Sequence, residues 1–308
     1  MIKILIIKLG YSETLDSEVG KVVSLGDVLR TTPILESLKE KYTKSNIIFL
    51  TDKKAEELVI GNKYIDRLLI WDEFMGFLLQ REKFDIVINL EKHPGICALV
   101  DMIDAWQKYG FRLETQTGHI DEYNQEISFI DYINNKSVTK DYWQKVLIEH
   151  LGIEWKKQKY SLGYTPKTDE TYDIGLNYQV GSKWPTKAMS KEKWNILHDK
   201  LIALGYKVTW QEGLSNIYEY IDWINSSKLI ISQDSLGLHL AMVLEKKLIG
   251  LFGSTGYEEV YPYGETVFMK NNSVCTHMPC YQDFCDNEKF CMDEIKIEHI
   301  INNVKELL

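Results

Sequence analysis

The stretch QDSLGLHLAMVLE (residues 233–245) combines side chains that could do chemistry together. Asp234 and Ser235 follow an apolar run and precede a helix-like segment, and His239 falls about one turn inside that segment. Free N–H groups at a helix start favour a phosphate, and a hydroxyl and an imidazole can each add a hydrogen bond. The same residues would also suit a helix cap and a packing histidine, so the spacing leaves both interpretations open.

Two other segments could contribute to a phosphate or nucleotide site. Lys183, in the loop GSKWPTK, follows a predicted strand and could reach a diphosphate. Glu212 follows the strand-like run YKVTWQ, and a carboxylate in that position can accept from ribose hydroxyls. Taken singly, each residue is more simply explained by a solvated surface loop.

Asp27 lies in SLGDVLRTTP, at the point where a helix begins. A carboxylate there can cap the helix. It can also act as a base, because ligands of open parallel sheets bind beyond the carboxyl ends of the strands. The two roles are compatible.

Four of the five cysteines are spaced C-x4-C-x4-C-x5-C, at Cys275, Cys280, Cys285 and Cys291. Four thiolates can form a tetrahedral structural site for iron or zinc. The spacing lacks the usual C-x2-C pairs, so free or partly paired thiols remain an alternative. His277 is a spare ligand, and Cys97 is expected to be a small core residue.

The elements that must position these residues alternate along the first half of the chain. Continuously apolar runs, typical of strands buried on both faces, alternate with amphipathic segments. This predicts parallel sheets with right-handed crossovers. The expected strands are 2–7, 46–51, 67–72, 85–90 and 109–112, and the expected helices are 28–41, 55–61, 74–83, 96–108 and 141–153. A polar excursion covers 115–140, and 154–172 is interpreted as a linker.

The pattern then restarts. The expected strands are 173–178, 206–211, 228–233 and 246–253, and the expected helices are 190–205, 236–245 and 295–308, the first of them between Ser190 as N-cap and Gly205. The prediction is therefore an α/β protein of two Rossmann-like domains, 1–166 and 167–308. Their parallel sheets should face a central cleft that holds the ligand.

Bulk properties exclude some function classes. The formal net charge is −9, which argues against a nucleic-acid-binding protein. No apolar run approaches the length of a membrane span, and the N-terminal run reads as a buried strand rather than a signal peptide. We expect a cytoplasmic protein without an integral membrane segment. A lipid acceptor would bring it to the inner membrane as a peripheral protein.

Taken together, several segments resemble the bacterial ADP-heptose:lipopolysaccharide heptosyltransferases, glycosyltransferase family 9. The resemblance covers most of the chain and is weakest at 112–170. It rests on IKILIIKLG, SLGDVLRTTPILESLK, IDRLLIWD, FDIVINLEK, SKWPTKAMSKEKW and ISQDSLGLHLAMVLEKKLIGLFGSTGYEEVYPYG.

The resemblance implies a GT-B fold with an N-terminal acceptor-binding domain and a C-terminal domain that binds the nucleotide sugar. It also implies transfer of a heptose from ADP-heptose with inversion and without a catalytic cofactor. Asp27 matches the general base of the family, and Lys183 the contact to the diphosphate. The implied donor-binding residues are Lys183, Glu212, Asp234, Ser235, Gly237 and His239.

Three departures from the family pattern limit the resemblance. The segment 11–24 is inserted before the motif that contains Asp27, where it would shape acceptor choice. Leu236 replaces the usual glycine, and Gly237 follows it. The four-cysteine segment is absent from the well-known lipopolysaccharide enzymes, but the heptosyltransferases that modify autotransporter proteins are similar in having a four-cysteine iron site.

The acceptor implied by the resemblance is a hydroxyl of a glycan or glycolipid, such as a lipopolysaccharide core, or of a protein. Two alternatives stay open at this level. One is a GT-B transferase for another nucleotide sugar, and the other is a catalytically silent glycan or nucleotide-sugar binder. The presence of Asp27 disfavours the second.

Overall fold

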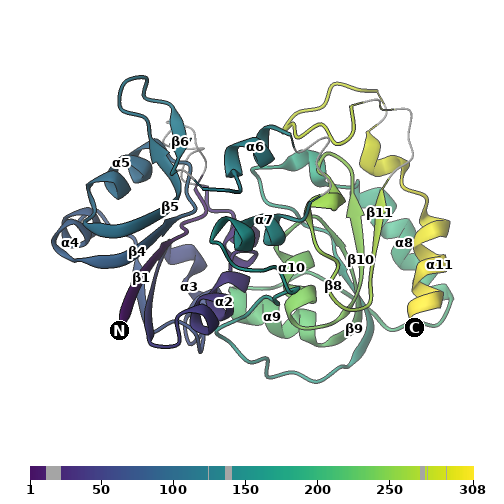
Figure 1. Ribbon diagram of the computed structural model, residues 1–308. Coiled ribbons are helices and arrows are strands. Elements are labelled where there is room, and N and C mark those ends of the chain that lie inside the picture. The colour runs from purple at the N-terminus through teal and green to yellow at the C-terminus, as the bar shows by residue number, and fades with distance from the viewer. Residues whose placement is uncertain (12–21, 124, 136–140, 271–274, 276, 289) are drawn as a thin grey trace. The chain divides into compact units, whose positions relative to one another are not determined.

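The computed structural model describes residues 1–11, 22–123, 125–135, 141–270, 275, 277–288 and 290–308 (Figure 1). The chain divides into two compact units, Met1–Tyr164 and Thr165–Leu308. Most of the inserted segment 11–24 lies outside the described residues. None of the helices in the described ranges combines the length and the apolar character needed to cross a membrane.

Unit 1 is built on a six-stranded sheet with the order β3-β2-β1-β4-β5-β6. Its strands are β1 Ile2–Ile7, β2 Ser45–Thr51, β3 Arg67–Ile70, β4 Phe84–Asn89, β5 Ala105–Leu113 and β6 Ile120–Glu122. All neighbours pair in parallel except β5 and β6, which are antiparallel. Because β1 is followed in sequence by β2 on one side and flanked by β4 on the other, the strand order reverses between β1 and β4.

Helices cover both faces of this sheet. Its helices are α1 Leu25–Leu29, α2 Pro33–Lys41, α3 Glu56–Val59, α4 Met75–Arg81, α5 Pro94–Met102, α6 Phe129–Asn134 and α7 Trp143–His150, with a short 3₁₀ turn η1 Lys53–Ala55. Met75 and Leu79 of α4 and Val100 of α5 pack onto one face with Leu5 and Ile7 of β1. Figure 1 shows α4 and α5 beside β4 and β5.

The expected helix 28–41 is two helices. α1 ends at Leu29, and α2 begins at Pro33. Proline has no N–H to continue a helix and is favoured at the first helical position. The hydroxyls of Thr31 and Thr32 donate to the carbonyls of Val28 and Leu29, which completes the break.

Two other expectations for unit 1 were wrong. Helix α5 ends at Met102, and residues 105–108 belong to β5, because Ala105 pairs with Phe84 of β4. The segment 115–140 contains β6 and α6 rather than irregular chain alone. Pairing with a neighbouring strand and packing on it decided these regions, and neither is visible in local periodicity.

Unit 2 carries a five-stranded parallel sheet with the order β11-β10-β9-β7-β8. Its strands are β7 Tyr172–Asn177, β8 Val208–Trp210, β9 Ser227–Gln233, β10 Lys247–Phe252 and β11 Thr266–Lys270. Its helices are α8 Lys191–Ala203, α9 Ile217–Asn225, α10 Leu236–Val243 and α11 Ile297–Leu307, with 3₁₀ turns η2 Pro185–Lys187, η3 Tyr257–Glu259 and η4 Cys291–Glu294. The strand order reverses between β7 and β9.

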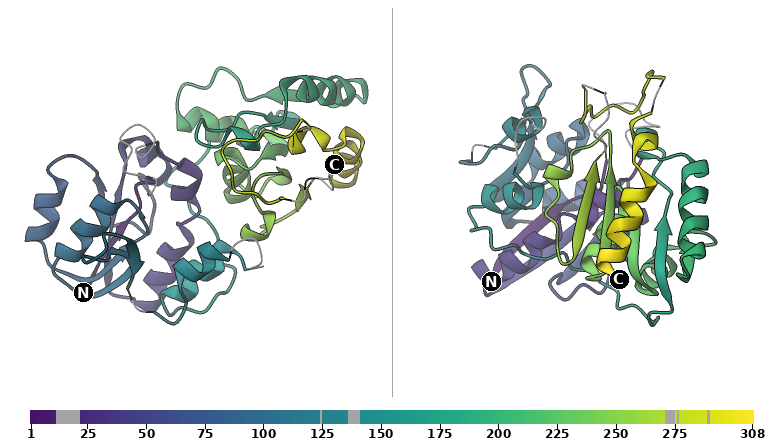
Figure 2. Two further views of the ribbon diagram at one scale, coloured as in Figure 1. Left: turned by 90° about the horizontal axis from the view of Figure 1, so that it is seen from above. Right: turned by 90° about the vertical axis from the view of Figure 1, so that its right-hand side faces the viewer.

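The core of unit 2 joins α8 and α11 to one face of the sheet (Figure 2). Trp194 and Leu197 of α8 and Ile300 of α11 are fully buried there. The expected cap of α8 is confirmed: the Ser190 hydroxyl accepts from the Lys193 N–H at 3.4 Å, and Gly205 ends the segment at φ +92°. Sequence reasoning passed over α9 and β11.

Candidate active site

The start of α10 lies where the strand order of the second sheet reverses. Ser235 is the N-cap of α10, directly after β9, and Asn177 ends β7. The Asn177 amide donates to the hydroxyls of Ser235 and Ser232, at 2.9 and 2.7 Å. The two strand ends are thus tied together at the position where open α/β sheets bind ligands.

Gly237, in the first turn of α10, is buried against this amide. A Cβ atom on Gly237 would lie 2.4 Å from the Asn177 Nδ2 atom, a distance that no real side chain tolerates. The missing side chain therefore lets the helix start pack onto the end of β7. This explains why position 237 requires a glycine.

Asp234 is held ionised by a cation and a hydroxyl. Its Oδ2 atom lies 2.7 Å from the Lys187 Nζ atom and accepts a hydrogen bond from the Thr255 hydroxyl, also at 2.7 Å. Burial by itself would raise the pKa of Asp234. The charges of Lys187 and His239 and the two hydrogen bonds outweigh burial and lower that pKa to about 2. Asp234 therefore stays charged at any physiological pH.

Sequence reasoning selected Lys183 in this loop, but Lys187 is the lysine that contacts Asp234. The 3₁₀ turn η2 ends at Lys187, and its ammonium also lies 5.6 Å from the centre of the Trp184 ring. The side chain of Lys183 is half-buried in the same loop. Nothing in the spacing distinguishes these lysines, because the 3₁₀ turn decides which one faces the end of β9.

His239 lies one turn into α10 and is only 4% exposed. Its electrostatic contribution to Asp234 shows that the two side chains belong to one cluster. Asp234, Ser235, Gly237 and His239 are thus brought together at the start of α10, whereas Lys183 and Glu212 lie on neighbouring loops.

Glu212 follows β8 and is engaged with a lysine. Its Oε1 atom lies 3.2 Å from the Lys191 Nζ atom and accepts from the Tyr178 hydroxyl at 3.3 Å. The same ammonium lies 3.6 Å from the centre of the Tyr178 ring and 3.9 Å from that of Trp210. Glu212 and Lys191 are each about half exposed, so the pair forms a polar, solvent-reachable edge beside two aromatic faces.

Asp27 belongs to unit 1, in the first turn of α1. Its carboxylate is 46% exposed and lies 3.7 Å from the Arg30 guanidinium. The Ser24 N–H, just before the helix, donates to the Gly10 carbonyl at 3.0 Å, which fixes the start of α1 beside the end of β1. Asp27 thus lies at the carboxyl edge of the first sheet, and no side-chain capping bond to α1 involves Ser24.

Comparisons with known proteins show what the chain is similar to. The model of glycosyltransferase family 9 (heptosyltransferase) matches residues 213–291. Lipopolysaccharide heptosyltransferase 3 of Escherichia coli is 22% identical over 341 residues, covering 92% of this chain and 96% of the relative. The chain is therefore similar to the heptosyltransferases of glycosyltransferase family 9.

Solved structures show that the chain has the GT-B fold. The E. coli ADP-heptose lps heptosyltransferase II matches with a TM-score of 0.71 at 14% identity, over 99% of this chain and 98% of that one. The E. coli heptosyltransferase WaaC with ADP matches with a TM-score of 0.66 at 13% identity, over the full length of both chains. The iron-containing dodecameric glycosyltransferase TibC of enterotoxigenic E. coli gives 0.60 at 12% identity, over 99% of this chain and 76% of that one.

The cysteine segment packs against the carboxyl end of β10. The Tyr281 N–H donates to the Ser254 carbonyl at 2.8 Å, and the Thr186 hydroxyl donates to the Gln282 carbonyl at 2.5 Å. Thr186 precedes Lys187, so the segment supports the loop that pairs with Asp234.

None of the five cysteines, all within the described ranges, forms a disulfide. Burial, followed by the thiols of Cys280, Cys275 and Cys285, raises the pKa of Cys291 to about 11. Within the described residues, however, no three cysteine, histidine or acidic side chains are placed to hold a metal ion.

Proposed function

We propose that this glycosyltransferase moves a heptose from ADP-heptose to a hydroxyl group of a cell-surface glycan, glycolipid or protein, with inversion at the anomeric carbon. Its relatives are named for heptose transfer, and WaaC, which shares the fold, binds ADP. The observation that carries the proposal is the start of α10, where the first turn of a helix, a serine and the Lys187–Asp234 ion pair meet at the strand-order reversal of the second sheet.

In this proposal the diphosphate binds at the start of α10. The N–H groups of the first turn and the Ser235 hydroxyl donate to it, because the helix start carries a partial positive charge. Lys183 and His239 add positive charge or a further donor as the diphosphate leaves. Asp234 orients Lys187 rather than binding phosphate itself, because a carboxylate ionised down to pH 2 would repel one.

Glu212 is proposed to accept from the ribose hydroxyls of the donor. Lys191 holds the carboxylate beside Tyr178 and Trp210.

Asp27 is proposed as the general base. As the acceptor oxygen bonds to the anomeric carbon, Asp27 takes the hydroxyl proton, and the bond from that carbon to the diphosphate oxygen breaks on the opposite face. The leaving diphosphate keeps the bonding electrons, and its charge is stabilised by the donor-binding residues. This chemistry uses no metal ion.

A panel of nucleotide sugars tests the function. Hydrolysis or transfer with ADP-heptose, and not with UDP- or GDP-sugars, is the expected result. Activity with a different nucleotide sugar instead would show that this sugar, and not ADP-heptose, is the donor. Binding of a nucleotide sugar without turnover of any member of the panel would show that the protein is a catalytically silent binder.

The base is tested with Asp27→Asn. We expect kcat to fall by about 10²- to 10⁴-fold, the usual contribution of a general base, with ADP affinity unchanged. A variant that binds ADP and keeps the full transfer rate would remove Asp27 from this role. For the donor site, Lys183→Met should weaken ADP binding, and an unchanged affinity would contradict the assignment of Lys183 to the diphosphate.

We also propose that Cys275, Cys280, Cys285 and Cys291 hold a structural iron or zinc ion. Four thiolates suit either metal. The proposed role is structural, because the segment supports the Lys187 loop. Metal analysis of the purified protein should give one metal ion per chain, and a Cys280→Ser, Cys285→Ser double variant should lose it. Metal-free wild-type protein would refute the proposal.

A further inference from the structure

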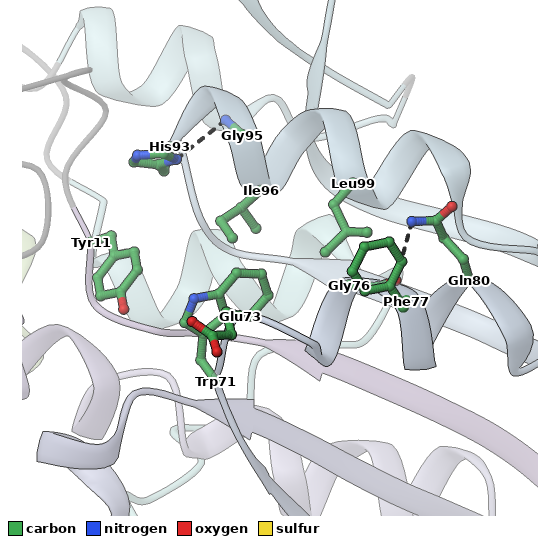
Figure 3. Close-up of a pocket in the computed structure, with 10 residues that line it drawn as sticks. All are labelled: Tyr11, Trp71, Glu73, Gly76, Phe77, Gln80, His93, Gly95, Ile96 and Leu99. Carbon is green, nitrogen blue, oxygen red and sulfur yellow. Dashed lines mark hydrogen bonds between the residues drawn. The ribbon is translucent and has the colours of Figure 1, made fainter. Parts of the chain in front are cut away.

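A cavity of about 360 Å³ opens at the carboxyl edge of the first sheet (Figure 3). Tyr11 follows β1 and His93 follows β4, and both line the cavity. These are the two strands between which the strand order of the first sheet reverses. The cavity therefore occupies the position where open α/β sheets bind ligands, and its volume falls within the range of ligand pockets.

Two glycines leave room along the cavity. Gly76 on α4 and Gly95 on α5 line it, and a Cβ atom on Gly76 would already contact the Leu99 side chain at 3.6 Å. Trp71, which follows β3, and Phe77 of α4 supply aromatic faces. Phe77 is 71% exposed, so its ring is open to solvent beside the cavity.

The polar groups of the cavity are held in defined states. The His93 Nδ1 atom accepts from the Gly95 N–H at 3.2 Å, so the ring proton is on Nε2, where it can be donated to a ligand. The Tyr11 hydroxyl donates to Asp52 at 2.6 Å, so Tyr11 presents its ring. The Tyr11 and His93 rings meet edge to face, with centres 6.2 Å apart.

The charge of the lining is one-sided. Glu73 contributes a carboxylate, and the ten lining residues, all within the described part of the chain, include neither lysine nor arginine. An anionic group placed here would meet a like charge without a compensating cation, which is costly. A neutral ligand with hydroxyl groups can instead donate to Glu73 and accept from His93.

The cavity is rigidly connected to the start of α1. The Glu91 carboxylate is fully buried and accepts from the N–H groups of Leu9, Gly10 and Tyr11, at 2.7, 2.7 and 3.0 Å. The Gly10 carbonyl in turn holds Ser24, three residues before Asp27. A ligand in the cavity therefore lies on the loop that positions the proposed base.

We propose that this cavity binds an uncharged sugar ring of the acceptor, with the apolar face of the ring against Trp71 and its hydroxyls toward Glu73 and His93. Flat aromatic faces beside a few polar groups fit such a ring. That this sugar ring belongs to the acceptor rests on the proposed function. The preference of the cavity for an uncharged sugar over an anionic one does not.

Binding is tested by saturation-transfer NMR on the full-length protein, with methyl glucoside as the neutral probe and glucuronate as its anionic match. We expect methyl glucoside to bind and glucuronate to bind at least threefold more weakly. The Trp71→Ala variant should weaken methyl glucoside binding about three- to tenfold, in line with the contribution of one aromatic contact. Trp106→Ala is the matched control, because Trp106 is 92% exposed and is absent from the lining.

Glu73→Gln provides a second test that does not depend on a buried side chain, because Glu73 is exposed. The Glu73→Gln variant should bind glucuronate more tightly than the wild type does, so the difference in affinity between the two probes should become smaller. Equal binding of both probes to the wild type, no binding of either, or equal effects of Trp71→Ala and Trp106→Ala would each overturn the proposal. ADP affinity should be unchanged in these variants, so a failure of the donor assignment would be seen separately.

Discussion

Replacing Lys187 by methionine tests how the second unit keeps Asp234 charged. The side chains of Lys187 and Asp234 are 17% and 13% exposed, so solvent screens their interaction little. A carboxyl group whose pKa falls from 3.8 to about 2 gains roughly 2 kcal/mol of folding free energy when ionised. Removing the lysine leaves the burial of Asp234 uncompensated, and we expect a loss of about 2 to 4 kcal/mol at pH 7.

The sign of the pH dependence follows from the lowered pKa. In the wild type, the stabilisation by Asp234 is complete above the unfolded-state pKa of 3.8 and disappears as the pH falls through about 2. In Lys187→Met the pKa of Asp234 rises, so acid protonates the carboxyl group sooner and removes its buried charge. The stability deficit should therefore be largest at pH 7 and shrink toward pH 4.

Amide hydrogen exchange in peptides from β9 and α10 measures this deficit in the second unit alone, at pH 7 and pH 4 after correction for the intrinsic exchange rate. Lys183→Met is the matched control and should leave the exchange of these peptides unchanged. A deficit of equal size at both pH values would refute the electrostatic reasoning and leave only lost packing. The double variant Asp234→Asn, Lys187→Met should recover part of the loss, because no unpaired charge remains.

Three further predictions concern single positions. Gly237→Ala should destabilise the second unit by about 1 to 3 kcal/mol and weaken ADP binding, because the added Cβ atom would overlap the Asn177 side chain. Thermal unfolding and ADP calorimetry measure these two effects. A variant with unchanged stability and ADP affinity would contradict the close packing. Glu91→Gln, which can accept at only one of its two terminal atoms, should destabilise unit 1 by about 2 kcal/mol or more and reduce sugar-probe binding, measured by hydrogen exchange and NMR. His150 is buried, and burial lowers its pKa. Its contribution to the stability of unit 1 is therefore complete above pH 6.5 and is lost as the pH falls through the lowered pKa. The His150→Asn variant should flatten this pH dependence, as measured by hydrogen exchange.

The neutral state of His150 follows from its two hydrogen bonds. Its Nε2 atom accepts from the Gly110 N–H at 3.0 Å, so the ring proton lies on Nδ1, which is 2.6 Å from the Ile127 carbonyl. Protonating Nε2 would break the first bond. No sequence signal marked this histidine, because its partners are 40 and 23 residues away.

The local sequence pattern predicted an element correctly where residues within that element determine its structure. The strand 2–7 and the helix beginning after Ser190 agree with β1 and α8 at or near their ends, because apolar runs and a serine cap act over a few residues. The pattern failed at 105–108, where pairing of β5 with β4 overrode a helix-like periodicity. It failed again at residues 30–32, where two threonine hydroxyls and a proline ended α1 early.

By itself, the sequence determined the fold class, the resemblance to the heptosyltransferases and the residue types at the start of α10, because these depend on periodicity and on motifs of adjacent residues. Only the tertiary structure decided that Lys187 rather than Lys183 contacts Asp234, and that Glu91 holds Tyr11 at a cavity. Lys187 and Asp234 are 47 positions apart, and Tyr11 and Glu91 are 80 positions apart. In the first case, the sequence also offers two similar lysines in the same loop. Strand order and the course of a single 3₁₀ turn set such contacts, and neither is encoded in local spacing.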